Sequence, residues 1–75
     1  MEDKIKEIMG LVFEIDPNTI SNDASPDTID NWDSIGAINL VTALEEAFQI
    51  EFTDDEIADM LNFELILHTL REKLN

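Results

Sequence analysis

The sequence predicts an all-α fold, a four-helix bundle with a long loop between helices 1 and 2 and a short third helix. Three observations predict it. Apolar residues recur at helical spacing in several segments, capping residues stand at the starts of those segments, and no segment shows the two-residue alternation of a strand. The 75 residues suffice for a single domain, 1–75, with one core.

The first helix is predicted over residues 3–14, and the segment Asp16-Pro17-Asn18 should end it. Its inner face follows the i, i+3, i+4, i+7 spacing: Ile5, Ile8, Met9 and Val12. Residues 19–31 then form a long connection rich in turn-forming residues, with Ile20 and Ile29 as its expected anchors in the core. A connection of this length in a small domain is typical of a functional loop.

The second helix is predicted to begin at Asp33 or Ser34, either of which can cap it, and to end near Phe48. Its apolar stripe has Leu40 beside it and consists of Ile38, Val41, Leu44 and Phe48. Near its far end, Glu45 and Glu46 are expected to face outward.

The third and fourth helices follow closely. Thr53 and Glu56 match a capping box, which predicts a helix over residues 54–60 that buries Ile57 and Met60. Asn62 can cap the last helix, residues 63–74. The expected inner face of that helix is Leu65, Ile66, Leu70 and Leu74.

The charge of the chain is strongly negative. Its 18 acidic and 4 basic residues give a net charge of −14, and all four cations lie near the termini. This excludes ordinary nucleic-acid binding, which needs cations against phosphates. It favours partners with basic docking patches, reached by electrostatic steering. The alternative is that the acidity serves only to keep a small protein in solution.

Composition also limits the location and the chemistry. No apolar run approaches the roughly 20 residues that span a bilayer, and no signal-peptide core follows Met1, so we expect a cytoplasmic protein without stable membrane insertion. We expect a monomer, because one core uses all the predicted apolar stripes. The absence of cysteine excludes disulfides and thiolate metal sites. Any thiol that the protein uses must come from a prosthetic group or a partner.

Ser34 is the candidate site of chemistry. It stands where an acidic loop meets a helix, and a helix N-terminus offers unpaired N–H groups and partial positive charge. Both favour a phosphate, so a phosphodiester on the Ser34 Oγ would be tolerated beside acidic neighbours. The structural alternative is that Ser34, like Asp33, is only a helix cap.

Asp33-Ser34-Ile35, followed by Ile-Asn-Leu-Val-Thr-Ala-Leu-Glu-Glu-Ala-Phe at residues 38–48, resembles the acyl carrier protein family. The resemblance extends through Phe-Thr-Asp-Asp-Glu at residues 52–56 and Asn62-Phe63, and spans essentially the whole chain. It implies a carrier rather than an enzyme. A phosphopantetheinyl transferase using magnesium would attach 4′-phosphopantetheine from coenzyme A to Ser34, and the thiol of that arm would hold acyl groups as thioesters.

The resemblance also implies partners and further sites. The partners would be acyl-loading and acyl-transfer enzymes of fatty-acid, lipid or secondary-metabolite synthesis. The candidate lining of an acyl pocket, each residue otherwise an ordinary core residue, is Leu40, Leu44, Phe48, Phe52, Ile57 and Met60. The candidate docking residues, besides the cofactor-binding motif of Asp33, Ser34 and Ile35, are Asn39, Thr42, Glu45 and Glu46.

Several positions depart from the family's housekeeping pattern, and they favour a specialised carrier. Ile35 replaces a leucine, and Thr42 stands where methionine is common. Three positions that are usually acidic hold Gly36, Asn39 and Ala47. Trp32, just before the motif, is also unusual and is interpreted as a loop anchor or as a partner-specific contact.

Three other functions remain possible from the sequence, and two further ones do not fit it. A peptidyl or aminoacyl carrier, a non-carrier acidic interaction module and a divalent-cation-binding module are the alternatives. A calcium-binding EF-hand does not fit, because placing Gly36 at the sixth loop position puts Ile35 at the fifth and Thr42 at the twelfth, so no metal site is predicted. A serine hydrolase does not fit either, since there is no Gly-x-Ser-x-Gly motif and His68, expected to be partly exposed on the last helix, is the only histidine.

Overall fold

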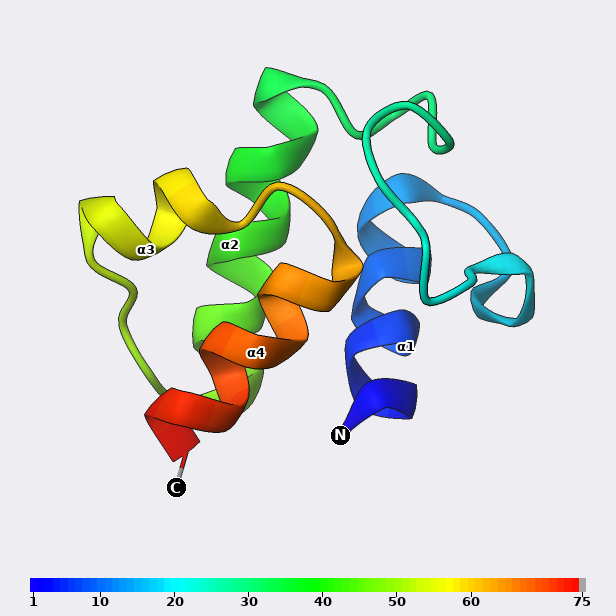
Figure 1. Ribbon diagram of the computed structural model, residues 1–75. Coiled ribbons are helices and arrows are strands. Elements are labelled where there is room, and N and C mark those ends of the chain that lie inside the picture. The colour runs from blue at the N-terminus through cyan, green and yellow to red at the C-terminus, as the bar shows by residue number, and fades with distance from the viewer. Residues whose placement is uncertain (75) are drawn as a thin grey trace.

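The computed structural model describes residues 1–74, and over this range it shows four α-helices, a short 3-10 helix and no strand (Figure 1). The all-α fold is therefore confirmed, with a long connection between the first two helices and a third helix of six residues. None of the helices described over residues 1–74 combines the length and the apolar character needed to cross a bilayer.

Helix α1 (Glu2–Phe13) begins and ends one residue before its predicted bounds. It ends because Glu14 adopts the left-handed conformation (φ 58°) and donates its N–H to the Gly10 carbonyl. Ile5, Ile8 and Met9 are buried as predicted. Val12 is only half-buried, and Phe13 lies in the core in its place.

The long connection begins with η1 (Pro17–Thr19), which is capped by the Asp16 side chain. Ile20 and Ile29 are buried, so the two predicted anchors are confirmed. Ala24 is a third anchor that the sequence did not indicate. It is 2% exposed, and its carbonyl accepts a hydrogen bond from the Phe63 N–H at 2.9 Å. The middle of the loop is thereby tied to the start of α4.

Helix α2 (Ser34–Phe48) confirms the predicted bounds but corrects the predicted inner stripe. Its fully buried line is Gly36, Leu40 and Leu44, at i, i+4 spacing. Ile38, predicted to be in the core, is 65% exposed. The reason is geometric, since a residue two positions along a helix is rotated by about 200° and faces the opposite side.

Helix α3 (Asp54–Asp59) starts with the predicted capping box. The Thr53 Oγ1 accepts from the Glu56 N–H at 3.2 Å, and the Glu56 Oε1 accepts from the Thr53 N–H at 2.8 Å. The helix ends one residue before the predicted Met60. Met60 is buried as predicted, but Ile57 is 38% exposed, because this short helix is held by buried residues at its two ends rather than along a continuous face.

Helix α4 (Phe63–Leu74) has the predicted bounds and the predicted cap, since the Asn62 Oδ1 accepts from the Leu65 N–H at 2.9 Å. Its inner face differs from the prediction and consists of Phe63, Ile66, Leu67 and Leu70. Leu65 is exposed because it lies about 200° around the helix from Phe63. Leu74 is exposed because it is the last helical residue, where the end of the helix leaves it uncovered.

The Glu56–Lys73 ion pair, which joins α3 to α4, should make stability sensitive to acid. The Lys73 Nζ lies 2.9 and 3.1 Å from the two Glu56 carboxylate oxygens. The hydrogen bond from Lys73, helped by the Thr53 N–H, lowers the pKa of Glu56 below its ordinary value. A lowered carboxyl pKa contributes stability above the unfolded-state pKa, about 4.3, and that contribution is lost as pH falls through the folded-state pKa.

We therefore expect Glu56→Gln to have a lower free energy of unfolding than wild type at pH 7. The difference in unfolding free energy between the two proteins should shrink as pH falls below about 4. Glutamine keeps the capping-box interaction and removes only the charge. Urea denaturation across this pH range is the measurement. Glu51→Gln, at an exposed loop carboxylate, is the control. A constant difference between wild type and Glu56→Gln from pH 7 to 3 would contradict the prediction.

Candidate functional site

The long loop leads directly into α2 (Figure 1). Ser34 is the first residue of this helix and is exposed to solvent. The preceding residue, Asp33, is the helix cap, because its Oδ1 accepts from the Gly36 N–H at 2.8 Å. Of the two predicted caps, the structure thus selects Asp33. The Ser34 hydroxyl is left at the positive end of the helix dipole without the capping role.

The residues before Ser34 are fixed to the end of α1. The indole of Trp32 stacks on the ring of Phe13 with a centroid distance of 5.4 Å and is only 4% exposed. The Asn31 Nδ2 donates to the Phe13 carbonyl oxygen at 2.8 Å and so satisfies one of the free carbonyls at the end of α1. Trp32 is therefore a loop anchor, and the alternative of a partner contact is wrong because its side chain is buried.

Asn31→Ala should reveal the strength of this attachment. Removing the side-chain amide leaves the Phe13 carbonyl without that partner, which should cost about 1 kcal/mol of unfolding free energy. Asn39→Ala, at an exposed position on α2, should change it by less than about 0.5 kcal/mol. Urea denaturation of the two variants is the measurement, and equal effects would show that Asn31 does not anchor the loop.

Gly36 permits the close approach of the loop to α2. A Cβ at this position would overlap the carbonyl oxygen of Asn31 and would lie 3.3 Å from the Asp33 Oδ1. Gly36 is buried, so this departure from the acidic family pattern faces the loop and not a partner. A side chain here would push away the segment that carries Ser34. The sequence marked Gly36 only as a position that is usually acidic in the family, and it gave no sign of this contact.

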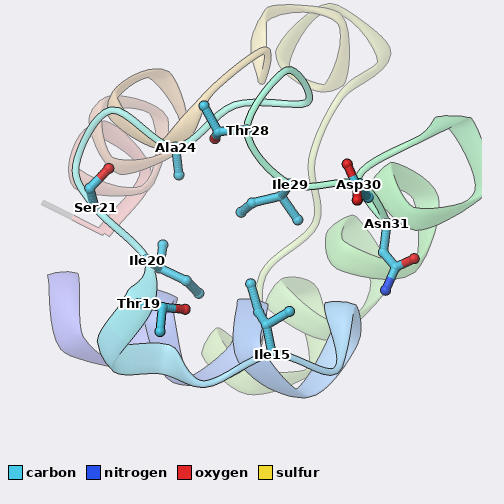
Figure 2. Close-up of a pocket in the computed structure, with 9 residues that line it drawn as sticks. All are labelled: Ile15, Thr19, Ile20, Ser21, Ala24, Thr28, Ile29, Asp30 and Asn31. Atoms are coloured by element: carbon cyan, nitrogen blue, oxygen red, sulfur yellow. The ribbon is translucent and has the colours of Figure 1, made fainter.

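The six candidate pocket residues lie in different environments. Leu40, Leu44, Phe52 and Met60 are buried, Phe48 is half-buried, and Ile57 is 38% exposed. None of them lines the 510 Å³ cavity, which lies between the end of α1, η1 and the loop (Figure 2). A pocket among the six residues would therefore require side chains that are now packed together to move apart.

The candidate docking residues lie mostly on the exposed side of α2. Ile35 is 71% exposed, and Asp33, Asn39, Thr42 and Glu46 are also exposed. Glu45 was predicted to face outward, but it is half-buried rather than exposed, because its Oε2 accepts from the Phe52 N–H at 2.8 Å. The prediction for Glu45 is thus wrong in part, since the carboxylate also holds the connection between α2 and α3.

Sequence reasoning missed Ile38 as a surface residue. It lies one helical turn after Ser34, on the same side as Ile35, and adds a second exposed apolar side chain beside the serine. The available signal was its i+4 spacing from Ser34, which places both residues on one helix face.

Comparison with known proteins identifies the family. The family model for the phosphopantetheine attachment site matches residues 3–70. The chain belongs to the acyl carrier protein family. It is 41% identical over 64 residues to the acyl carrier protein of Buchnera aphidicola subsp. Acyrthosiphon pisum, covering 83% of this chain and 76% of that protein. It is 32% identical over 74 residues to that of Petrotoga mobilis, covering 97% and 86%. The acyl carrier protein of Thermosynechococcus vestitus is 29% identical over 72 residues, covering 96% and 89%.

Membership of this family makes the protein a phosphopantetheine-bearing carrier. The surroundings of Ser34 fit that cofactor: the hydroxyl is exposed, it lies at a helix N-terminus that favours a phosphate, and the exposed Ile35 and Ile38 beside it on α2 are uncharged. The serine hydrolase alternative has no support, since His68 is exposed on α4 with its Nε2 3.3 Å from the Glu72 Oε1. Residues 1–74 hold no cluster of three acidic or histidine side chains suited to a metal ion.

Proposed function

We propose that the Ser34 Oγ carries the 4′-phosphopantetheine arm and that the protein presents acyl thioesters on this arm to partner enzymes. The observation that supports this most is the separation of roles between neighbours. Asp33 caps the helix, which leaves the Ser34 hydroxyl exposed and free for a partner enzyme. The loop is also held in place by Trp32 and Asn31, so the serine is presented on a rigid support.

The attachment reaction transfers one group. The Ser34 oxygen would form a bond to the phosphorus next to the pantetheine in coenzyme A, and the bond from that phosphorus to the other phosphate would break. Adenosine 3′,5′-bisphosphate leaves, and the serine proton passes to a base of the transferase. Positive potential at the start of α2 stabilises the phosphodiester that remains on Ser34.

Partner enzymes would approach through the exposed side of α2. The contact surface that we propose combines an apolar start, Ile35 and Ile38, with neutral polar residues, Asn39 and Thr42, and an acidic end at Glu46. Asp33 and Glu45 would add charge, although one oxygen of each already accepts a hydrogen bond within the chain. Such a surface needs a partner with an apolar depression near Ser34 and a basic patch farther along α2.

The cargo is proposed to be an acyl group on the thiol of the arm. A long apolar chain could be sheltered among the candidate pocket residues only if the packed core around Leu40 and Leu44 opened. The pathway, the cytoplasmic location and the monomeric state stay predictions, as does the specialised character of the carrier.

The deciding experiment combines intact mass with site mapping. The purified protein would be incubated with coenzyme A, magnesium and a broad-specificity phosphopantetheinyl transferase. We expect a gain of one phosphopantetheine, located by fragmentation on Ser34 and not on Ser21 or Ser25, the other two serines. A folded protein that gains no mass with several transferases would overturn the carrier function and favour an acidic interaction module.

A further inference from the structure

Helices α1 and α2 lie side by side and run in opposite directions (Figure 1). Between them is an open groove, which we call the α1–α2 groove, with a volume of about 350 Å³. Its apolar lining consists of Ile8, Leu11 and Val12 from α1 and of Ala43 and Ala47 from α2. In each helix these residues are three or four positions apart, so the groove runs along both helices.

Leu11 is the apolar side chain that the α1–α2 groove leaves uncovered. It is 81% exposed, the largest exposed fraction among the large apolar side chains of residues 1–74. Ile8 is buried and forms the floor, whereas Ala47 is exposed. The short side chains of Ala43 and Ala47 allow another helix to pack close to α2. An acidic residue at position 47, as in the usual family pattern, would place a charge in this lining.

Two opposite charges flank one end of the groove. Lys4 of α1 and Glu46 of α2 complete its lining. Because the helices are antiparallel, the start of α1 lies beside the end of α2, so both residues are at the same end. Both are exposed, and neither takes part in an ion pair within residues 1–74. The groove therefore offers a cation on one edge and an anion on the other.

The occupant that this surface fits is a helix. Lys4 and Leu11 are seven residues apart, so the lining extends about 10 Å along α1, the length of two helical turns. A helix with apolar residues at i, i+3, i+4 and i+7 presents a stripe of that length. A second copy of the chain fits poorly, because each copy has a net charge of −14 and two copies repel each other.

We propose that the α1–α2 groove binds an amphipathic helix of a partner protein. Leucine-type side chains of that helix cover Leu11 and Ala47. A lysine or arginine on one edge of its stripe faces Glu46, and a carboxylate on the other edge faces Lys4. The lining starts on α2 nine residues, or about 14 Å, after Ser34, so docking here requires no arm and does not rest on the proposed function.

The probe for the test is a synthetic peptide of about 15 residues with blocked ends, long enough to form a helix. It has leucines at i, i+3, i+4 and i+7 spacing, lysines along one edge of this stripe and an equal number of glutamates along the other, so that it carries no net charge. Isothermal titration calorimetry measures its affinity, and backbone amide NMR shifts locate it. We expect a dissociation constant of about 100 μM or lower, with the shifts concentrated in residues 4–12 and 43–47.

Two leucine variants test the apolar contact. Leu11→Gln should weaken peptide binding at least about tenfold, because one leucine is no longer buried in the complex. Leu61→Gln is the matched control, since Leu61 is 63% exposed and does not line the groove. Its affinity should stay within about twofold of wild type. Circular dichroism and urea denaturation would verify that both variants are folded, and equal weakening by the two would overturn the inference.

Exchanging the edge charges tests the charge complementarity. Lys4→Glu and Glu46→Lys should each weaken binding about threefold, because each gives both edges of the groove the same charge. The double variant has opposite edges again, so the peptide binds end for end and the affinity returns to within about twofold of wild type. Simple attraction to an acidic protein would instead move the two single variants in opposite directions, and that result would contradict the proposal.

The remaining outcomes separate this proposal from the carrier function. Ser34→Ala should bind the peptide as wild type does, whether or not Ser34 accepts phosphopantetheine. Absence of binding at about 1 mM peptide, amide shifts outside the groove, or binding that requires a loaded arm would each overturn the inference. Dimers in sedimentation velocity that Leu11→Gln abolishes would also overturn it, because a second copy would then fill the groove.

Discussion

Ser34→Ala should accept no phosphopantetheine while remaining as stable as wild type. The loss of loading is complete because no other atom of the residue can form the phosphodiester. Stability should change by less than about 0.5 kcal/mol, because Asp33 rather than Ser34 caps α2 and the serine side chain is exposed. This combination separates a chemical role of the serine from a structural one.

The measurement is intact mass after incubation with coenzyme A, magnesium and the transferase, with urea denaturation alongside. Ser25→Ala is the matched control, because Ser25 lies in the long loop, where its Oγ accepts from the Asp27 N–H. That variant should still load. If Ser34→Ala gained the same mass as wild type, the attachment point would lie elsewhere. If it lost mass gain and stability together, the serine would have to be reassigned a structural role.

Gly36→Ala should have the largest effect on stability among the variants considered and should also slow loading. The added methyl group overlaps the Asn31 carbonyl oxygen, which is backbone and cannot rotate away as a side chain would. Overpacking costs about 1–3 kcal/mol, and an overlap with backbone should lie near the upper end of that range. The better helix propensity of alanine, about 1 kcal/mol, then offsets only part of it. The loop must move instead, and Asp33 and Ser34 move with it.

Gly10→Ala is the control for this second prediction. A Cβ at Gly10 would lie 2.8 Å from the Pro17 Cγ and 2.9 Å from the Ile15 carbonyl oxygen, so this variant should also be destabilised. Its contacts are with Pro17 of η1 and with Ile15, and neither residue belongs to the Asp33 cap or to the segment 31–34. We expect loading by the transferase to be slower only in Gly36→Ala, with both rates measured under conditions that keep the proteins folded. Equal loading rates would show that the close approach at Gly36 does not position Ser34.

The local signals in the sequence predicted the ends of the elements well. The capping box at Thr53 and Glu56, the cap at Asn62 and the cap before Ser34 all form the expected hydrogen bonds. These interactions join residues three positions apart, so the chain determines them without reference to the rest of the fold. The candidate serine and its position at a helix start followed from the same kind of signal.

The inner faces were predicted less well, because apolar residues outnumber the positions that the core can take. Ile38, Ile57 and Leu65 have the character of core residues and are exposed. Which of two apolar stripes faces inward depends on the direction from which the neighbouring helices approach, and periodicity does not contain that direction. The exposed Ile38 then became part of the surface beside Ser34.

The sequence by itself determined the helical class, the caps, the acidity and the serine at the start of α2, because these depend on composition and on contacts between near neighbours. Only the tertiary structure decided how that serine is supported. Trp32 on Phe13, Asn31 on the Phe13 carbonyl and Gly36 against the Asn31 carbonyl bring together the end of α1, the loop and the start of α2. Two of these contacts join residues 18 or more positions apart, and such pairs are specified by the packing of the whole chain rather than by any local pattern.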